Sequence, residues 1–399
     1  MNLYPYQETG VEFLLEAPRR YLADRMGLGK TVQALVALQR LGPIDPPLVI
    51  APAGAIPTWR EQSRKFGVPA PPMISYTGFI HKDWRRFGRP SVVILDEAHY
   101  CKTPSAQRTK AALKVAQSAD RAWLLSGTPM PNDPRELYTA FKMLWPDLMP
   151  EGVRTAADWR DHYTKWRPTT FGPKVYGTRN AADLRRRLDT FMLRRGLRDV
   201  GLEIPPVRVD VQFLPYMREF AEELGRIEQT RGLDLSHAET RRLLGVHKAG
   251  PVAKTIAAEM RDRAYPAIVV MYYHLDVGGE VGRVLREAGL RVVGFDGSAT
   301  ERERTLAINT FRAEGADVFL VQQGAGGTGV DGLQDRASEI VLLEPHYSPE
   351  INAQYIKRVH RIGQDRPVRA RLFAVDGSAD AGLMDSLAAK VAMHREVFG

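Results

Sequence analysis

Short apolar segments that alternate with helix-compatible segments are the feature that most limits the fold of this chain. Basic stretches with helical patterns separate them. A first group lies at residues 48–51, 73–76, 91–95 and 122–126, and a second at 267–271, 291–295, 318–321 and 340–343. Apolar strands that alternate with helices predict a parallel sheet covered on both faces. We therefore expect two α/β units.

Length and composition narrow the class of protein. The chain has 399 residues, of which 44% are hydrophobic and 26% charged, so it is long enough for two or three domains and is neither disordered nor collagen-like. No run of about 18 apolar residues is present, which argues against a membrane span. A single cysteine, Cys101, excludes a disulfide framework and a multi-thiolate metal site. The net charge of +9 favours a polyanionic partner.

The section between the two α/β units has a different pattern. Residues 135–265 carry few strand signals and several amphipathic helical ones, for example at 181–193 and 218–228. Pro205 and Pro206 form the best linker candidate, because neither continues a helix. The first ten residues lack the basic and apolar regions of a signal peptide, so we expect a cytoplasmic, nucleoid-associated protein.

A candidate phosphate-binding loop lies near the amino terminus, in the segment DRMGLGKT at residues 24–31. It follows a strand candidate at 21–23 and precedes a helical pattern from 30 to about 41. Glycines let backbone N–H groups approach phosphates, and the helix N-terminus favours their charge. Lys30 would contact the β- and γ-phosphates and Thr31 would hold Mg²⁺. Asp24 stands where G-x-x-x-x-G-K-[ST] has its first glycine; the alternative is a plain glycine turn.

An acidic pair follows the apolar run at 91–95, in the segment DEAH at residues 96–99. Two carboxylates at the end of a buried strand suit nucleotide hydrolysis. We expect Asp96 to bind Mg²⁺ and Glu97 to orient and deprotonate the attacking water. The alternative is a solvated strand end. For His99 we expect a structural or coupling role, and for Cys101 a packing role.

The second α/β unit contains two further candidates. The segment GAGGTG at 324–329 permits close backbone approach to a phosphate chain. Arg358 and Arg361 are three positions apart, which predicts that they share one face of a helix. Two guanidinium groups would stabilise charge developing on a γ-phosphate. The alternatives are a flexible loop and a solvated basic helix.

Taken in this order, the motifs resemble those of the superfamily 2 helicase-like ATPases, in particular the SWI/SNF-type, remodeller-like branch with its annealing-helicase and bacterial or phage members. The resemblance covers about residues 3–375. Its motifs are LYPYQ at 3–7, DRMGLGKT at 24–31, VIAPA at 49–53, DEAH at 96–99, LSGTP at 125–129, MLRR at 192–195, FDGS at 295–298 and RIGQ at 361–364. Motif V, GGTGVDGLQ at 326–334, is one residue longer than usual. The length leaves no room for accessory domains, so nucleosome remodelling is not expected.

The resemblance implies a fold, a site and a partner. The fold class would be α/β, with two RecA-like parallel-sheet lobes and helical insertions between them: lobe 1 at 1–134, its insertion at 135–205, the insertion of lobe 2 at 206–265 and lobe 2 at 266–399. ATP would lie in the cleft, bound by Gln7 as the adenine reader and by the loop residues Asp24, Met26, Gly27, Leu28, Gly29, Lys30 and Thr31. Thr31 and Asp96 would hold Mg²⁺. The catalytic residues would be Lys30, Asp96, Glu97, Arg358 and Arg361.

The implied activity is ATP-dependent translocation on double-stranded DNA, including forked or branched DNA. We expect a monomeric motor of bacterial or phage origin, with an unidentified protein partner left open. Three alternatives stay open: a strand-separating DNA or RNA helicase, the motor subunit of a restriction or defence system, and a non-hydrolysing DNA-binding adaptor. An unwinding assay separates the first from a translocase, and a phosphate-release assay tests the last.

Overall fold

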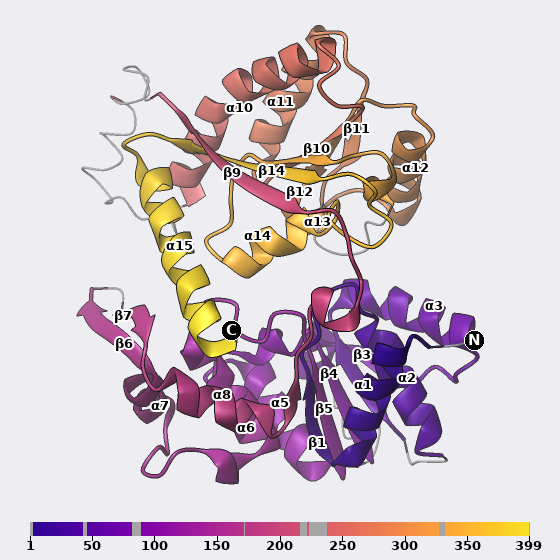
Figure 1. The fold of residues 1–399 in the computed structure, drawn as a ribbon, viewed down its shortest axis with the longest axis vertical. Coiled ribbons are helices and arrows are strands. Elements are labelled where there is room, and N and C mark those ends of the chain that lie inside the picture. Colours follow the sequence, from indigo (N-terminus) through magenta and orange to yellow (C-terminus); the bar gives the residue numbers. More distant parts are fainter. Residues whose placement is uncertain are drawn as a thin grey trace. The chain divides into compact units, whose positions relative to one another are not determined.

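The computed structural model describes residues 3–42, 46–81, 89–170, 172–215, 222, 238–326 and 332–398. The chain forms two compact units, Met1–Glu203 with Ala389–Gly399, and Ile204–Ala388 (Figure 1). Each unit is built on a six-stranded sheet. Among the helices of the described ranges, none is both long and apolar enough to cross a membrane.

The sheet of the first unit is parallel throughout, in the order β3-β2-β4-β5-β1-β8. Its strands are β1 (Arg19–Leu22), β2 (Leu48–Ala51), β3 (Met73–Ser75), β4 (Val92–Asp96), β5 (Arg121–Leu125) and β8 (Met192–Leu193). Leu125 is the register partner of both Leu22 and Asp96. The carboxyl ends of β1, β4 and β5 therefore meet at one edge, where the predicted motifs follow.

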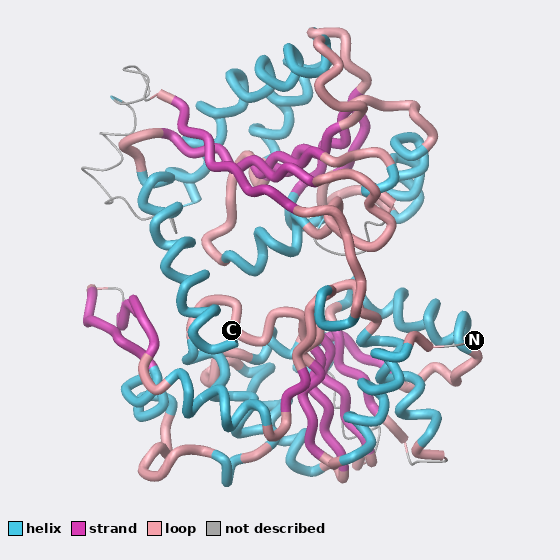
Figure 2. The backbone as a smooth tube through the Cα atoms, in the orientation of Figure 1, coloured by secondary structure: helices cyan, strands magenta, loops and turns pink. Residues whose placement is uncertain are grey.

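Helices cover both faces of this sheet (Figure 2). They are α1 (Pro5–Glu16), α2 (Lys30–Arg40), α3 (Ile56–Phe66), α4 (Tyr76–His81), α5 (Gln107–Ser118), α6 (Tyr138–Leu144), α7 (Ala156–Tyr163) and α8 (Ala181–Asp189). One core contains Val11, Leu35 and Trp59, and the other contains Phe141 and Trp159. The apolar strand residues are buried on both sides, which is why these strands read as continuous apolar runs.

The second unit repeats the design, with a parallel sheet in the order β11-β12-β10-β13-β14-β9. Its strands are β9 (Val207–Leu214), β10 (Ile268–Tyr272), β11 (Val292–Phe295), β12 (Val318–Gln322), β13 (Glu339–Leu342) and β14 (Val368–Val375). Its helices are α10 (Ala238–Arg261), α11 (Leu275–Glu287), α12 (Glu301–Arg312), α13 (Gln323–Gly326) and α14 (Pro349–Ile356). Helix α15 (Ala379–Phe398) begins in this unit and ends in the first.

The predicted fold class is confirmed, because each unit is a parallel sheet covered by helices and all eight apolar runs are strands. For the middle section we expected mainly helices, but the structure also contains strands there. It contains an antiparallel hairpin, β6 (Thr164–Thr169) and β7 (Gly172–Thr178), and the strand β9. The helix expected over 181–193 ends at Asp189, before β8. The helix expected at 218–228 lies outside the described residues apart from position 222, and the four-part domain division stays a prediction.

Candidate active site

The loop between β1 and α2 has the geometry of an anion-binding turn. Gly27 and Gly29 have φ values of 93° and 74°, which side chains other than glycine rarely adopt. Gly29 directly precedes α2, so the free N–H groups of the first helical turn face the loop. The side-chain amine of Lys30 donates to the backbone oxygen of Asp24 at 2.8 Å. Met26 packs beside Gly127, where a Cβ would lie 2.8 Å from Met26 Cγ.

Gln7 lies against this loop. Its side-chain amide donates to the backbone oxygen of Leu28 at 3.4 Å and accepts from the N–H of Tyr4 at 3.1 Å. A Cβ on Gly29 would lie 2.5 Å from Gln7 Nε2. The loop thus needs glycine at position 29 both for its backbone conformation and for contact with Gln7, whose adenine-reading role stays a prediction.

The carboxylate of Asp24 is fully buried, and Arg195 neutralises it. The guanidinium donates to both Asp24 oxygens, from Nε at 3.0 Å and from Nη2 at 2.6 Å. The Arg195 backbone N–H adds a bond of 3.1 Å, and Gln33 Nε2 adds one of 3.4 Å. Arg195 also donates to the backbone oxygen of Tyr6 at 2.7 Å. One guanidinium therefore joins the phosphate loop to the segment that presents Gln7.

The acidic pair lies at the end of β4. Trp59 Nε1 donates to Asp96 Oδ2 at 2.7 Å, and the Tyr76 hydroxyl donates to the Asp96 backbone oxygen at 2.8 Å. Glu97 has a φ of 49°, a left-handed conformation that is uncommon outside glycine. The Glu97 N–H donates to Asp96 Oδ1 at 3.0 Å, so both carboxylate oxygens of Asp96 accept a hydrogen bond.

A hydroxyl and imidazole network joins Glu97 to the turn after β5. His99 Nδ1 lies 3.2 Å from Glu97 Oε2, 2.9 Å from Ser126 Oγ and 3.2 Å from Thr128 Oγ1. The Ser126 hydroxyl donates to Glu97 at 3.4 Å. His99 therefore connects the carboxylate to the SGT turn, and whether its role is structural or one of coupling stays open.

The surroundings of the two carboxylates shift their pKa values in opposite directions. Burial, with the nearby charge of Glu97, raises the pKa of Asp96. Burial alone would also raise the pKa of Glu97, but the hydrogen bond and charge of His99, together with Lys30 and Ser126, outweigh it and lower that pKa. Glu97 is consequently the more stable anion of the pair.

In the second unit the two predicted arginines are near each other in sequence but do not share a helix. Helix α14 ends at Ile356, and the N–H of Arg358 and that of Val359 bond back three residues, to Tyr355 and Ile356. Our expectation of one helical face is therefore wrong: Arg358 and Arg361 lie in the tight turns that follow the helix. Arg358 is buried and Arg361 is partly exposed.

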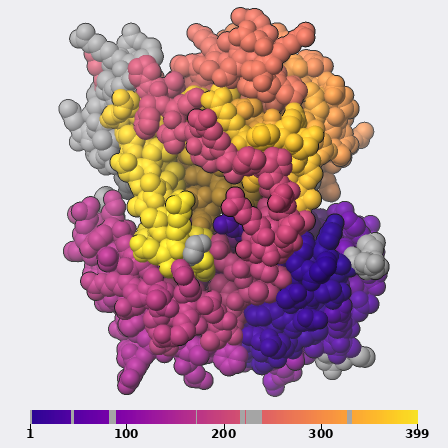
Figure 3. Space-filling model, in the orientation of Figure 1, coloured from indigo at the N-terminus to yellow at the C-terminus, as the bar shows by residue number. Residues whose placement is uncertain are grey.

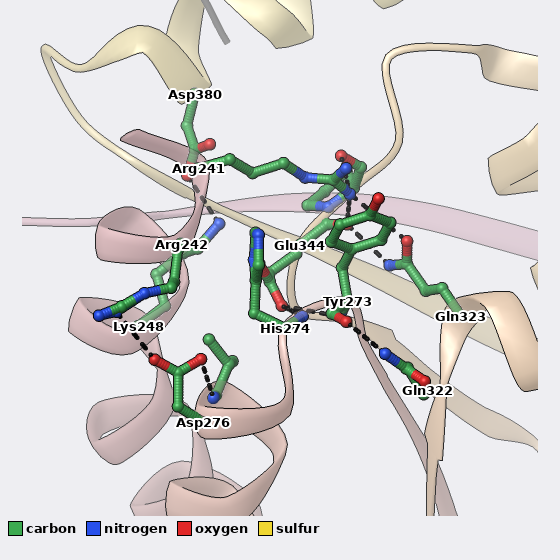
Figure 4. Close-up of polar contacts among 12 residues, drawn as sticks. Arg241, Arg242, Lys248, Tyr273, His274, Asp276, Gln322, Gln323, Glu344 and Asp380 are labelled. Atoms are coloured by element: carbon green, nitrogen blue, oxygen red, sulfur yellow. Dashed lines mark hydrogen bonds and ion pairs between the residues drawn. The ribbon is translucent and has the colours of Figure 1, made fainter. Parts of the chain in front are cut away.

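A second polar site lies at the carboxyl ends of β10 and β12 (Figure 4). Glu344 is its centre, because its carboxylate accepts from the N–H groups of Tyr273 and His274 at 2.7 and 3.0 Å. The Gln322 side chain donates to the Tyr273 backbone oxygen at 3.0 Å. An open cavity of about 790 Å³ lies beside it, lined by residues that include Arg242, His274, Gly297, Arg304, Gln322 and Gly324.

The structure brings together the first-unit candidates at one edge of its sheet: Gln7, Asp24, Met26, Gly27, Leu28, Gly29, Lys30, Thr31, Asp96 and Glu97. Their roles stay predictions, as do those of Arg358 and Arg361. Motif V lies largely outside the described residues, since positions 327–331 are not among them.

Sequence reasoning missed three residues that support this site: Gln33, Trp59 and Arg195. Arg195 belongs to the MLRR segment that contributed to the resemblance, but the sequence does not indicate that it binds Asp24. The apolar spacing of α3 explains why Trp59 is buried, but nothing in the sequence indicates that its indole binds Asp96.

Comparisons with known proteins agree with the order of these motifs. Residues 75–224 match the SNF2-related domain, and residues 253–363 match the helicase conserved C-terminal domain. The chain is 26% identical over 418 residues to a Caenorhabditis elegans homolog of SWI/SNF-related matrix-associated actin-dependent regulator of chromatin subfamily A-like protein 1, covering 95% of this chain and 59% of the relative. It is also 26% identical over 426 residues to the mouse DNA annealing helicase and endonuclease ZRANB3, covering 95% of this chain and 39% of that protein.

The chain thus spans about 39% to 59% of the length of these relatives. Among solved structures, the Sulfolobus solfataricus SWI2/SNF2 ATPase core in complex with dsDNA is similar, with 19% identity, coverage of 100% of this chain and 93% of that chain, and a TM-score of 0.45. The two relatives are animal proteins, so the expected bacterial or phage origin has no support from them.

Proposed function

We propose that this chain, which belongs to the SNF2-related family of helicase-like ATPases, hydrolyses ATP to move along double-stranded DNA. The observation that carries the proposal is the meeting of the phosphate loop, the acidic pair and the SGT turn at one edge of the first sheet. One of the animal relatives is a DNA annealing helicase, which supports DNA as the polymer along which this chain moves. A fork or branch as the preferred DNA, and any protein partner, belong to the same proposal.

In this account the first unit binds ATP and supplies the base. Gln7 reads the adenine, and the Gly27–Thr31 loop binds the phosphates through backbone N–H groups and Lys30. The lowered pKa keeps Glu97 ionised, so that its carboxylate can accept a hydrogen bond from the attacking water and orient it. The same carboxylate is the group that we propose as the proton acceptor. His99 and Ser126 hold that carboxylate in place through the contacts described above.

The donor set also suits Mg²⁺. The Thr31 hydroxyl and the Asp96 carboxylate offer only oxygen atoms, the ligands that this cation prefers, and Trp59 fixes the orientation of Asp96 from behind. When bound, the ion would neutralise charge on the phosphate oxygens. We propose that Thr31 and Asp96 hold it.

The second unit supplies the remaining charges. Arg358 and Arg361 act on the charge that develops as the γ-phosphate is transferred, which ties hydrolysis to a two-unit arrangement. The cavity beside Arg242 and Arg304 offers cations and amides to the DNA backbone. Such contacts grip phosphates and sugars and read no base edges, as a motor on varied sequence requires.

The test is a phosphate-release assay with double-stranded DNA, single-stranded DNA, forked DNA and RNA in parallel. Strong stimulation by duplex or forked DNA, without displacement of a labelled strand from a blunt duplex, supports a translocase. Stimulation by single strands with strand displacement would support a strand-separating helicase. No hydrolysis with any nucleic acid would overturn the proposal.

A further inference from the structure

The hairpin β6–β7 of the first unit carries exposed cations that have no part in the proposed ATPase site. We propose that the cationic surface formed by Lys165, Arg167 and Lys174 binds the phosphate backbone of a DNA segment. The inference rests on the proposed function only in its choice of DNA as the polyanion.

The charge of the hairpin is one-sided. Positions 164–179 contain Lys165, Arg167, Lys174 and Arg179 and no acidic residue. Lys174 is the cross-strand partner of Arg167, so these two share a face. Lys165 lies two positions before Arg167 on β6, on the other side of the register shift between Lys165 and Trp166, and extends the cationic surface along the strand. All three are exposed, and none forms an ion pair with any residue of the described ranges.

The pairing of Arg167 with Lys174 favours an anionic ligand. Like charges directly opposite each other in an antiparallel pair destabilise it. A polyanion across this face would relieve that repulsion. The stem of Lys165 lies across Gly177, where a Cβ would be 3.2 Å from Lys165 Cδ, so the third amine is directed by the same pair of strands.

The face is held in a defined position. At the base of the hairpin, Trp166 donates from Nε1 to Asp161 at 2.7 Å and stacks under the Arg160 guanidinium at 3.9 Å. Arg160 Nε donates to the same Asp161 carboxylate at 2.8 Å, so that anion is already neutralised. Nearer the tip, Arg135 Nη1 donates to the backbone oxygen of Pro173 at 3.1 Å. Because Arg135 follows the SGT turn, the hairpin is joined to the segment that leaves the candidate active site.

The composition favours nucleic acid over an acidic protein. A shift in register between Lys165 and Trp166 leaves Tyr176 without a cross-strand partner, and its side chain is 57% exposed. Bulges redirect side chains in this way, and exposed aromatic rings among cations are typical of surfaces that contact sugars and bases. Figure 1 shows β6 and β7 extending from α7 on the side of the first unit opposite α3, and Figure 3 shows this part of the chain at the surface. Since α3 follows the segment at 49–53 that resembles a DNA-contacting motif, the hairpin would reach a second stretch of DNA.

The experiment compares two triple variants with the wild type. One is Lys165→Gln with Arg167→Gln and Lys174→Gln. The control is Lys110→Gln with Lys114→Gln and Lys254→Gln, which removes the same charge from other exposed positions. Dissociation constants for a plain duplex and for a forked DNA of equal length are measured without ATP, at several salt concentrations. DNA-free ATPase and unfolding temperature are measured for each protein.

We expect the hairpin variant to bind forked DNA about tenfold more weakly, with a log–log salt slope smaller by about 2 to 3, because each phosphate contact contributes about 0.9. Its unfolding temperature should stay equal or rise, since a repulsive pair is gone. A loss confined to the fork identifies a branch arm as the ligand, and an equal loss on both identifies the duplex; either supports the inference.

Unchanged affinity and slope, or a loss no larger than in the control variant, would overturn the inference. Failure of the proposed function would give a different result, which would be visible in the wild-type protein. In that case the wild type itself would bind no DNA, or its ATPase would not respond to DNA.

Discussion

Asp24 is the residue where this phosphate loop departs most from the common pattern, and the structure explains the departure. A buried carboxylate is costly unless it is paired and hydrogen-bonded, and Arg195 satisfies both of its oxygens. The loop itself was predictable from DRMGLGKT. Its partner was not, because Arg195 lies 171 residues away and reaches Asp24 only through the pairing of β8 with β1.

Arg195 is therefore expected to position the nucleotide site without touching the phosphates. Arg195→Lys should raise the KM for ATP more than it lowers kcat, because an ammonium group cannot bond both Asp24 oxygens and Tyr6 together. Arg195→Gln should also lower the unfolding temperature, since removing one partner of a buried ion pair costs about 3–5 kcal/mol. Steady-state ATPase kinetics and thermal unfolding check this, with Arg194→Lys as the control. A KM within about twofold of wild type in Arg195→Lys would contradict the positioning role.

Substitutions of Lys30 and Glu97 should both lower ATPase activity, but for different reasons. Lys30→Ala removes a phosphate-binding cation, so ATP affinity should fall. Glu97→Gln leaves the loop and Asp96 in place, so ATP should still bind while turnover falls by about 10²–10⁴-fold. Phosphate release and equilibrium nucleotide binding separate the two. Turnover above about a tenth of wild type in Glu97→Gln would exclude the general-base role.

At the scale of elements, the apolar runs predicted strands correctly, but two strands that contain charged residues, β9 and β14, were not predicted. Strand β14 was missed because Arg369 and Arg371 interrupt the apolar run at its start. Arg371 is fully buried, and it pairs with Glu259 at 2.9 Å and lies 3.5 Å from Glu339. Strand β9 was missed because it is an edge strand whose valines alternate with polar residues and are exposed.

The end of α14 was also unpredictable from spacing alone. The Gln364 side chain donates to the backbone oxygens of Val359 and Ala337 at 3.1 and 2.9 Å, which holds the chain in a turn after the helix. Gly363 has a φ of 94° and completes that turn. A three-residue spacing therefore predicted a helical face where the tertiary contacts of Gln364 produce a loop.

The packing of α1 on α2 gives a prediction at this scale. A Cβ on Gly10 would lie 1.7 Å from Gln33 Oε1 and 2.9 Å from Arg195 Nη2. Gly10→Ala should lower the free energy of unfolding by about 1–3 kcal/mol, as overpacking does, and raise the KM for ATP by disturbing the Asp24 contacts. Denaturant unfolding and ATPase kinetics measure both effects.

Gly279→Ala is the matched control, because Gly279 is an exposed position in helix α11 with no atom near its absent Cβ. It should stabilise the protein by about 0.5–1 kcal/mol through helix propensity. Equal effects of the two substitutions would show that α1 and α2 tolerate the extra methyl group.

At the scale of the whole molecule, the alternation of apolar runs with helical segments predicted two parallel-sheet units, and the order of the motifs indicated which of them meet at one edge of the first sheet. Motifs that follow parallel strands must meet at one edge, which is why Lys30, Asp96 and Glu97 lie together. This argument does not apply to Arg358 and Arg361, because they lie in turns of the second unit, outside the first sheet. We propose that they act on the nucleotide together with the first unit, and a functional test is needed to establish this role.

A motor that grips the backbone should be indifferent to sequence and sensitive to salt. Two unrelated duplexes of equal length should stimulate ATPase to a similar degree, and DNA affinity should fall steeply as salt rises. ATPase titrations with both duplexes at low and high salt provide the data. A preference of about a hundredfold for one duplex would indicate base readout and count against the motor.

The most direct test of the two-unit account is the DNA-stimulated ATPase rate of Arg361→Ala. Arg302→Ala, at an exposed position of helix α12 in the same unit, is the control for loss of one positive charge. The account predicts near-normal ATP binding by Arg361→Ala and a loss of about 10³–10⁵ in rate, with poor rescue by Arg361→Lys, because the planar guanidinium stabilises charge in the transition state. A rate within about threefold of wild type, equal to that of Arg302→Ala, would contradict the account and leave Arg361 as an ordinary surface cation.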